Sequence, residues 1–313
     1  MAYHIYGLHM ITVVGAGRVG ISAALHIALK ELDDITLIDI VEGLPQGEAL
    51  DLSHMCGILG IDVDIRGSND YKDMEGSDIV VVPAGFIRKA DMTRMDLLFK
   101  NYEVLKLVSE KIKEYAPRSK VIVVTNPLDV MTYVAYKVTG FERNRVMGFS
   151  GPLDTGRFKT LIKRELSVSY KSIDAPIIGE HGETMVLLPR HTYVCGKPLI
   201  ELLPKEKIDK IVEETRKMGA QVIKLKGWSA SHAPGAGVAI MVESIIKDQK
   251  RVVPTSVYLQ GEYGVSDVCL VVPAVLGKNG VENIIKLPLN DEEKNAFMKS
   301  AETVKNAIAQ LKL

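Results

Sequence analysis

Three glycines near the start of the chain have the spacing of a site that binds a dinucleotide. Gly15, Gly17 and Gly20 form a G-x-G-x-x-G pattern directly after the apolar run at residues 11–14. In such a site the first glycine permits a tight turn, the second lets the backbone approach a pyrophosphate, and the third lets the next helix pack closely. The helix expected to begin near Arg18 would direct its free N–H groups and positive dipole end at the phosphates.

A carboxylate follows where an adenosine ribose would need one. A second apolar strand is predicted at residues 35–38, and Asp39 comes directly after it. Asp39 lies about 20 residues beyond the glycines, where a carboxylate accepts hydrogen bonds from ribose hydroxyls. Glu42 adds a second negative charge, which would repel a 2′-phosphate. We therefore expect the cofactor to be NAD rather than NADP.

Further polar side chains come after predicted strands, where open α/β sheets bind their ligands. The segment GFIRKADMTRMD follows a strand predicted at 78–82, and the segment VTNP closes another at 121–124. Further along the chain come LDTGR and GEHGE. The candidate site residues in these segments are Arg88, Arg94, Asn126, Asp154, Arg157 and His181. Residues 151–157 have part of a phosphate-loop spacing, but the Lys-Ser/Thr pair is missing and no strand ends there, so we exclude that motif.

The elements that must position these residues alternate in type over the first half of the chain. Strand patterns are predicted at 11–14, 35–38, 62–66, 78–82, 121–124 and 145–149, and helical patterns at 19–30, 97–115 and 128–139. This alternation predicts an α/β fold with a doubly wound, mostly parallel sheet of the Rossmann type. Residues 1–150 would form a dinucleotide-binding domain.

The pattern changes after about residue 150. Helices are predicted at 153–166, 205–224, 229–247 and 291–311, and strands at 172–177, 184–188, 255–259 and 268–274. We therefore expect residues 151–313 to form a C-terminal α+β domain, packed against the first, that carries substrate-binding and catalytic residues.

Composition excludes several classes of function. The chain has 313 residues with 39 Lys plus Arg and 39 Asp plus Glu, so it shows no net charge for nucleic acid or a membrane surface. No apolar run reaches membrane-spanning length, and the segment MAYHIYGLHM does not resemble a secretory signal. Three isolated cysteines form no disulfide framework, and no H-E-x-x-H pattern indicates a metal. We expect a cytoplasmic protein with a small-molecule ligand.

The motifs, taken in order, resemble those of the lactate/malate dehydrogenases, which act on 2-hydroxy acids. They are GAGRVG, the strand-end Asp39, AGFIRK followed by TR, then VTNP, LDTGR and GEHGE. The resemblance extends from about residue 11 to the end of the chain, where PTSVYLQGEYG and VPAVLGKNG also look like family sequence. Six motifs in family order are far more specific than any one of them.

The resemblance implies a catalytic arrangement. His181 would donate and accept the proton, which suits an imidazole with an ordinary pKa of about 6.5. Asp154 would accept a hydrogen bond from the other ring nitrogen, and Arg157 would hold the C1 carboxylate with two parallel donors. Asn126 would bind the substrate oxygen on C2, and Arg94 would polarise the carbonyl during hydride transfer.

The resemblance also implies the binding partners. Arg88 lies where the family sets specificity, and an arginine there suits the second carboxylate of malate or oxaloacetate, a reaction of the tricarboxylic acid cycle. Ser229 would line the substrate pocket. NAD would be held by Gly15, Gly17, Arg18, Val19, Gly20, Asp39, Asn101, Val124 and Asn126. The family also implies a homo-oligomer, with a tetramer favoured and a dimer as the alternative.

Two other functions remain to be weighed, and the sequence departs from the family pattern at two places. A lactate or broader 2-hydroxy-acid dehydrogenase is disfavoured because the methyl group of pyruvate would leave the Arg88 charge unpaired. A non-catalytic NAD-binding or structural protein would share the fold, since a fold does not fix a function. In the loop after Arg88, Ala90-Asp91 replaces the family's frequent Pro-Gly, and Glu183-Thr184 replaces a frequent Asp-Ser.

Overall fold

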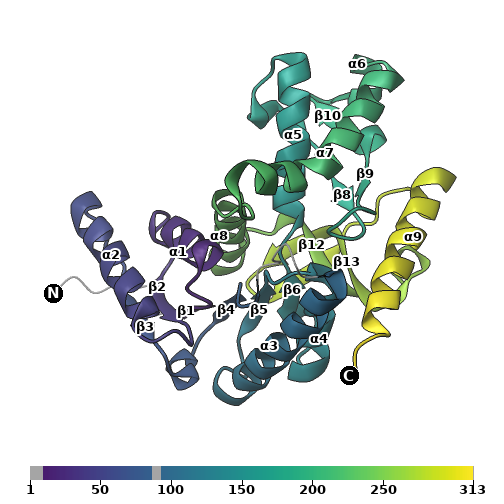
Figure 1. Cartoon of the computed structure of the whole chain (residues 1–313). Helices are drawn as coiled ribbons and strands as arrows, with labels where there is room; N and C mark the ends of the chain where they lie inside the picture. The colour runs from purple at the N-terminus through teal and green to yellow at the C-terminus, as the bar shows by residue number, and fades with distance from the viewer. Residues whose placement is uncertain (1–9, 87–92, 313) are drawn as a thin grey trace.

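One long sheet with a parallel middle forms the centre of the protein. The computed structural model describes residues 10–86 and 93–312, and of Arg94 it describes the backbone alone (Figure 1). Six parallel strands lie in the order β6-β5-β4-β1-β2-β3. They are β1 (Met10–Val14), β2 (Asp34–Ile38), β3 (Ile65–Ser68), β4 (Ile79–Val82), β5 (Lys120–Val123) and β6 (Val146–Gly148). The order reverses between β1 and β4, the switch point where doubly wound folds bind ligands, and the predicted Rossmann sheet is confirmed.

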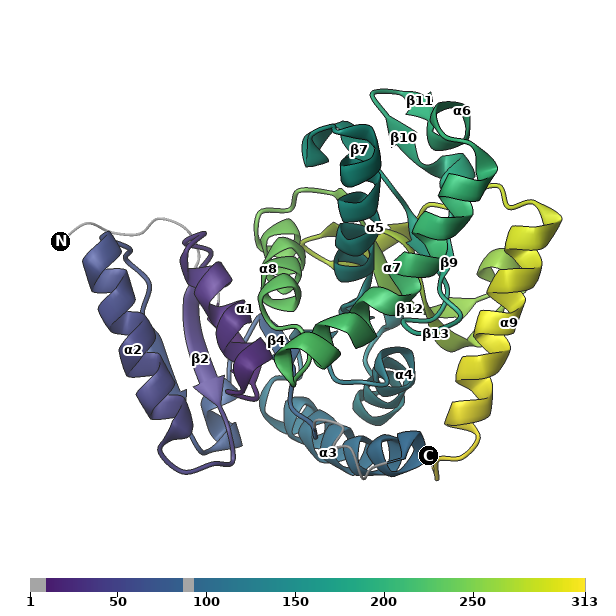
Figure 2. The ribbon, with the colours of Figure 1, turned by 45° about the horizontal axis from the view of Figure 1, so that its top comes forward.

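Burial on both faces explains why these strands read as continuous apolar runs. All four residues of β4, with the sequence IVVV, are buried, and such strands need helices on each side. The helices of the first half are α1 (Arg18–Ala28), α2 (Leu44–Leu59), α3 (Arg94–Tyr115) and α4 (Leu128–Thr139). Figures 1 and 2 show α3 beside α4, and α1 beside α8 (His232–Ile246) from the second half of the chain.

The second half of the chain extends the same sheet. Three antiparallel strands, β12 (Arg251–Gln260), β13 (Ser266–Gly277) and β14 (Gly280–Ile284), continue from the edge at β6 to give a nine-stranded sheet. Ser256 of β12 lies opposite Gly148 of β6. The strands expected at 255–259 and 268–274 therefore belong to the Rossmann sheet, because they satisfy the backbone groups that β6 would otherwise leave unpaired at its edge.

A smaller layer with its own apolar cluster lies over this sheet. Its helices are α5 (Gly151–Leu166), α6 (Leu199–Leu202) and α7 (Lys205–Lys226), and the cluster includes Phe158, Ile162 and Ile208. Its short strands are β7 (Ile173–Asp174), β8 (Ile177–Ile178), β9 (Val186–Leu187), β10 (Tyr193–Val194) and β11 (Lys197–Pro198). Helix α9 (Asp291–Ile308), yellow in Figures 1 and 2, packs against α4, β9 and β13.

Several predicted boundaries differ from the structure. The strand expected at 62–66 lies at Ile65–Ser68, and the run at 172–177 divides into β7 and β8, which belong to different small sheets. The helix expected from 229 begins at His232. Helix α2 and strand β14 had no counterpart in the sequence-based prediction.

Candidate active site

The glycine turn between β1 and α1 leaves open space at the start of a helix. Gly15 has a φ of +117°, and a Cβ there would lie 2.8 Å from the backbone nitrogen of Ala84. A Cβ on Gly20 would lie 1.9 Å from the carbonyl oxygen of Gly15, so α1 packs closely against the turn. A Cβ on Gly17 would meet no atom within 4 Å, and α1 begins at the next residue without a side-chain cap. The unpaired N–H groups of the first helical turn therefore have room for a pyrophosphate.

Asp39 is fixed beside this turn. Its Oδ2 accepts from the backbone N–H of Ala16 at 2.7 Å, and its Oδ1 accepts from the N–H of Val41 at 3.0 Å. The N–H of Gly15 donates to the carbonyl of Ile38 at 2.7 Å, which ties the turn to the end of β2. Each carboxylate oxygen retains a lone pair that can accept from a ribose hydroxyl. The geometry therefore fits the expected dinucleotide.

Two cavities lead from the glycine turn to the residues that the sequence predicts to be catalytic. One, of about 320 Å³, is lined by Gly15, Gly17 and Trp228. The other, of about 290 Å³, is lined by Arg157 and His181. Both are also lined by Val19, Val124, Asn126, Ile223, Ser229 and Ala230. Because the two share this wall, they form one groove with a nucleotide end and a substrate end.

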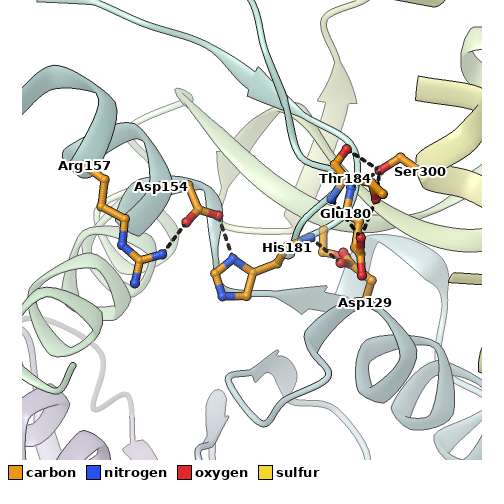
Figure 3. A network of polar contacts seen from close by, with 8 residues as sticks. Asp129, Asp154, Arg157, Glu180, His181, Thr184 and Ser300 are labelled. Carbon is orange, nitrogen blue, oxygen red and sulfur yellow. Dashed lines mark hydrogen bonds and ion pairs between the residues drawn. The ribbon is translucent and has the colours of Figure 1, made fainter. Parts of the chain in front are cut away.

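His181 and Arg157 share one carboxylate at the substrate end (Figure 3). Asp154 lies in the first turn of α5 and is 1% exposed. Its Oδ2 lies 2.6 Å from Nδ1 of His181, and its Oδ1 accepts from Nη1 of Arg157 at 2.9 Å. Helical spacing of three residues places Asp154 and Arg157 on one face. In the tautomer that donates from Nδ1 to Asp154, Nε2 is free to exchange a proton with a ligand.

The Asp154 carboxylate keeps the imidazole basic. Burial disfavours the imidazolium, but the charge of Asp154 and its hydrogen bond outweigh burial and raise the pKa of His181 above 6.5. This shift favours the protonated ring, which is the form that a general acid needs.

A second, buried carboxyl group holds the backbone of His181. Asp129 lies in α4 and is 2% exposed. Its Oδ2 accepts from the N–H of His181 at 2.7 Å, and its Oδ1 accepts from the hydroxyl of Ser256 at 2.6 Å. Burial raises the pKa of Asp129 to about 7, although both hydrogen bonds favour the charged form. One carboxyl group thus joins α4, β12 and the loop that carries His181.

Helix α9 holds the same loop from another side (Figure 3). The hydroxyl of Ser300, which is fully buried, accepts from the N–H of Glu180 at 2.5 Å and donates to the carbonyl of Thr184 at 3.1 Å. The Thr184 hydroxyl donates to the Glu180 carboxylate. Gly179 has a φ of +91°, and a Cβ there would lie 2.7 Å from the Ser300 oxygen. The loop is therefore fixed both before and after His181.

Asn126 lies where the two cavities meet. The bond between Asn126 and Pro127 is cis. The Asn101 side chain, 1% exposed, donates to the carbonyl of Asn126 at 2.6 Å and accepts from the N–H of Phe86 at 2.7 Å. Asn101 thus holds the backbone of two turns beside the groove, and it is not among the described residues that line either cavity. Its expected contact with NAD stays a prediction.

Comparison with known proteins decides the family. Residues 9–148 match the family model of the lactate/malate dehydrogenase NAD binding domain, and residues 152–312 match that of the alpha/beta C-terminal domain. The chain belongs to the lactate/malate dehydrogenase family. The resemblance inferred from the order of the motifs is therefore confirmed, and this dehydrogenase is an NAD-dependent oxidoreductase.

Relatives match this dehydrogenase over nearly its whole length. The malate dehydrogenase of Caldivirga maquilingensis is 52% identical over 303 residues, which cover 96% of this chain and 98% of the relative. The solved malate dehydrogenase of Aeropyrum pernix has a TM-score of 0.94 and 48% identity, covering 97% of this chain and 98% of its own. That of Plasmodium falciparum in complex with NADH has a TM-score of 0.91 and 34% identity, covering 96% and 98%.

The expected site residues of this dehydrogenase are distributed as follows. Val19, Val124, Asn126 and Ser229 line both cavities, and Arg18 lies with its guanidinium carbon 4.0 Å from the centre of the Trp228 ring. Arg88 and the Ala90-Asp91 departure lie outside the described residues. Arg94 is the first residue of α3. Among described residues, no helix has the length and apolar character to cross a bilayer, and no group of His, Cys, Asp or Glu is arranged to hold a metal ion.

Sequence reasoning missed the residues that support His181. Asp129 comes three residues after Asn126, and a lone carboxylate in the apolar helix LDVMTYVAY was an available signal. Ser256 and Ser300 gave no such signal, since a single serine in a strand or an amphipathic helix is ordinary. Arg216, on α7, lines the substrate end of the groove and was not singled out either.

Proposed function

We propose that this protein is a malate dehydrogenase that catalyses (S)-malate + NAD⁺ ⇌ oxaloacetate + NADH + H⁺. The observation that carries the proposal is the pair of contacts made by Asp154, which brings an imidazole and a guanidinium to one cavity. Malate dehydrogenases at 52% and 48% identity support malate rather than lactate as the substrate.

His181 moves the proton in this reaction. In malate oxidation, neutral Nε2 accepts the proton of the C2 hydroxyl, and Asp154 stabilises the imidazolium that forms. In oxaloacetate reduction, the imidazolium returns the proton to the carbonyl oxygen. Arg157 holds the C1 carboxylate, so C2 is kept beside the imidazole. NAD, when bound in the groove, supplies the acceptor for the hydride that leaves C2.

Asn126 and two arginines complete the substrate contacts. The Asn126 amide, at the junction of the cavities, donates to the oxygen on C2. Arg94 polarises that carbonyl, and Arg88 binds the carboxylate at the far end of the substrate. Ser229 contributes to the wall of the same pocket.

The cofactor end of the groove favours NAD over NADP. Asp39 presents a carboxylate beside the glycine turn, where it accepts from the ribose hydroxyls and repels a 2′-phosphate. Gly15, Gly17, Gly20, Arg18, Val19, Asn101 and Val124 hold the remainder of the dinucleotide. In this division of labour, residues 1–150 bind the cofactor and residues 151–313 carry most of the catalytic groups.

The proposal also covers the oligomeric state and the cellular location of the protein. We assign a homotetramer, with a dimer as the alternative, acting in the cytoplasm within the tricarboxylic acid cycle. The family resemblance supports the oligomer, and the composition supports the cytoplasm.

Initial rates with oxaloacetate, pyruvate and 2-oxoglutarate, each with NADH and NADPH, test the function. We expect a kcat/KM for oxaloacetate about 10⁴-fold above that for pyruvate, because pyruvate has no second carboxylate to pair with the charge of Arg88. NADH should be strongly preferred over NADPH. Preference of the unaltered protein for pyruvate, or equal use of both cofactors, contradicts the assignment.

The Arg88→Gln variant tests the specificity residue. It should weaken oxaloacetate reduction most and so shift the ratio of kcat/KM values toward pyruvate. Lys89→Gln removes the neighbouring positive charge and is the matched control, with little expected change in the ratio. An unchanged ratio in Arg88→Gln removes this residue from the argument.

A further inference from the structure

Helix α7 brings a second arginine to the wall of the substrate cavity. Arg216 lines the cavity together with Arg157 and His181. Its Nε and Nη2 donate to the carbonyl oxygen of Met185, at 3.2 and 3.0 Å, and Met185 lines the same cavity. These bonds hold the guanidinium at the wall, and the N–H groups on Nη1 are left for another acceptor.

The positive charge of Arg216 is not compensated by any carboxylate among the described residues. Its hydrogen bonds go to a neutral carbonyl, and burial alone lowers the pKa of Arg216 although the residue as a whole is exposed. Arg157, in contrast, is paired with Asp154 at 2.9 Å. Glu183 is the acidic residue among the described residues that line this cavity, and its negative charge does not attract an anionic substrate. The wall therefore offers one cation already partnered and one that is available.

The two guanidinium groups come from neighbouring helices. A Cβ on Gly219, one turn after Arg216 on α7, would lie 3.3 Å from Nη2 of Arg157 on α5. The absence of a side chain at Gly219 lets α7 lie directly over Arg157. Arg157 and Arg216 are thus set at the same cavity by regular helices, and their positions do not depend on the segment that contains Arg88.

We propose that Arg216 is a further specificity-determining residue, a second cation in addition to Arg88 for the substrate carboxylate that Arg157 does not hold. This inference rests on the proposed dicarboxylate reaction. A dianion gains from a second cation at the cavity wall, whereas a substrate with a neutral end leaves that cation without a partner. Arg216 therefore raises the affinity for oxaloacetate and malate and contributes nothing to pyruvate.

The test compares Arg216→Met with Lys217→Met. Both variants remove one positive charge from adjacent positions on α7, but the Lys217 side chain is 71% exposed and paired with Glu213 on the helix surface. In Arg216→Met, kcat/KM for oxaloacetate should fall about 10- to 100-fold, mainly through KM, with kcat/KM for pyruvate and KM for NADH unchanged. Lys217→Met should change each value by less than about twofold.

Two further variants separate charge from the contact with Met185. Arg216→Lys keeps the charge and should retain most of the oxaloacetate activity, whereas Arg216→Gln keeps a donor without charge and should behave like Arg216→Met. Equal losses for both keto acids, or a loss matched by Lys217→Met, would overturn the inference. If the unaltered enzyme does not reduce oxaloacetate, the proposed function itself fails, independently of any Arg216 variant.

Discussion

Asp154 divides its charge between two cations with different tasks. One oxygen fixes the tautomer of His181 and the other fixes the guanidinium of Arg157. Because the carboxylate is almost fully buried, its interactions are weakly screened, and the raised pKa of His181 follows from this. In the proposed reaction, the same side chain would therefore orient the guanidinium that holds the substrate and favour protonation of the imidazole beside it.

Asp154→Asn should change the pH dependence of both directions of catalysis. Reduction of oxaloacetate needs the imidazolium, so its rate falls as pH rises through the pKa of His181, while malate oxidation needs the neutral ring and rises. Without the carboxylate the pKa of His181 falls, so the pH-dependent changes in the rates of reduction and of oxidation should both move to lower pH. The value of kcat should drop by about 10² to 10⁴. The measurement is kcat/KM against pH in each direction.

His181→Asn provides the control for that experiment. It should abolish most turnover at every pH and leave NADH binding nearly intact. If the rates of Asp154→Asn and of the unaltered enzyme change at the same pH, Asp154 does not set the charge of the imidazole.

Asp129→Asn should alter how stability depends on pH. In the folded protein the pKa of Asp129 is raised from 3.8 to about 7, so its protonated form is favoured by folding. The associated stability is complete below the unfolded pKa and is lost as pH rises through about 7. The difference in free energy of unfolding between the unaltered protein and Asp129→Asn should therefore fall with pH, by up to about 1.4 kcal/mol per unit. Urea unfolding at several pH values measures this difference in free energy. If the difference does not change with pH, Asp129 is charged in the folded protein and its pKa is not raised.

At the scale of elements, two glycines of the turn between β1 and α1 have different roles, one in packing and one in ligand binding. A side chain at Gly20 collides with backbone, whereas one at Gly17 enters open space. Gly20→Ala should destabilise the fold by about 2 kcal/mol or more, and Gly17→Ala should cost less than about 1 kcal/mol but weaken NADH binding. Thermal unfolding and NADH titration distinguish them. Equal destabilisation by both variants would contradict a ligand-binding role for the space at Gly17.

The parallel half of the sheet was predictable because its strands are buried on both faces and end in polar residues with defined spacing. Helix α2 was not, because Leu50, Ile58 and Leu59 are exposed on it and obscure the apolar periodicity. The union of β12 with β6 was also missed, since sequence patterns identify strands but not their partners. The pair of Asp154 and His181 followed from motif order, while Ser300 could be recognised only once α9 was placed.

At the scale of the molecule, the shared sheet should make unfolding cooperative. The main apolar core contains residues of both halves, such as Val80 of β4 and Val257 of β12. Denaturant unfolding followed by the fluorescence of Trp228, the one tryptophan of the chain, and by far-UV circular dichroism should give coincident transitions. Two separate transitions would mean that residues 1–150 and 151–313 fold as independent units.

The contact between Ser300 and the loop at Glu180 also has a consequence for synthesis. The two residues are 120 positions apart, so a ribosome working at about 5–20 residues per second needs on the order of ten seconds to pass from one to the other. During that interval the nascent chain already contains the glycine turn and His181, but not the hydroxyl that secures the loop. A growing chain therefore contains the residues of the nucleotide site and His181 well before it contains the hydroxyl that fixes the loop of His181.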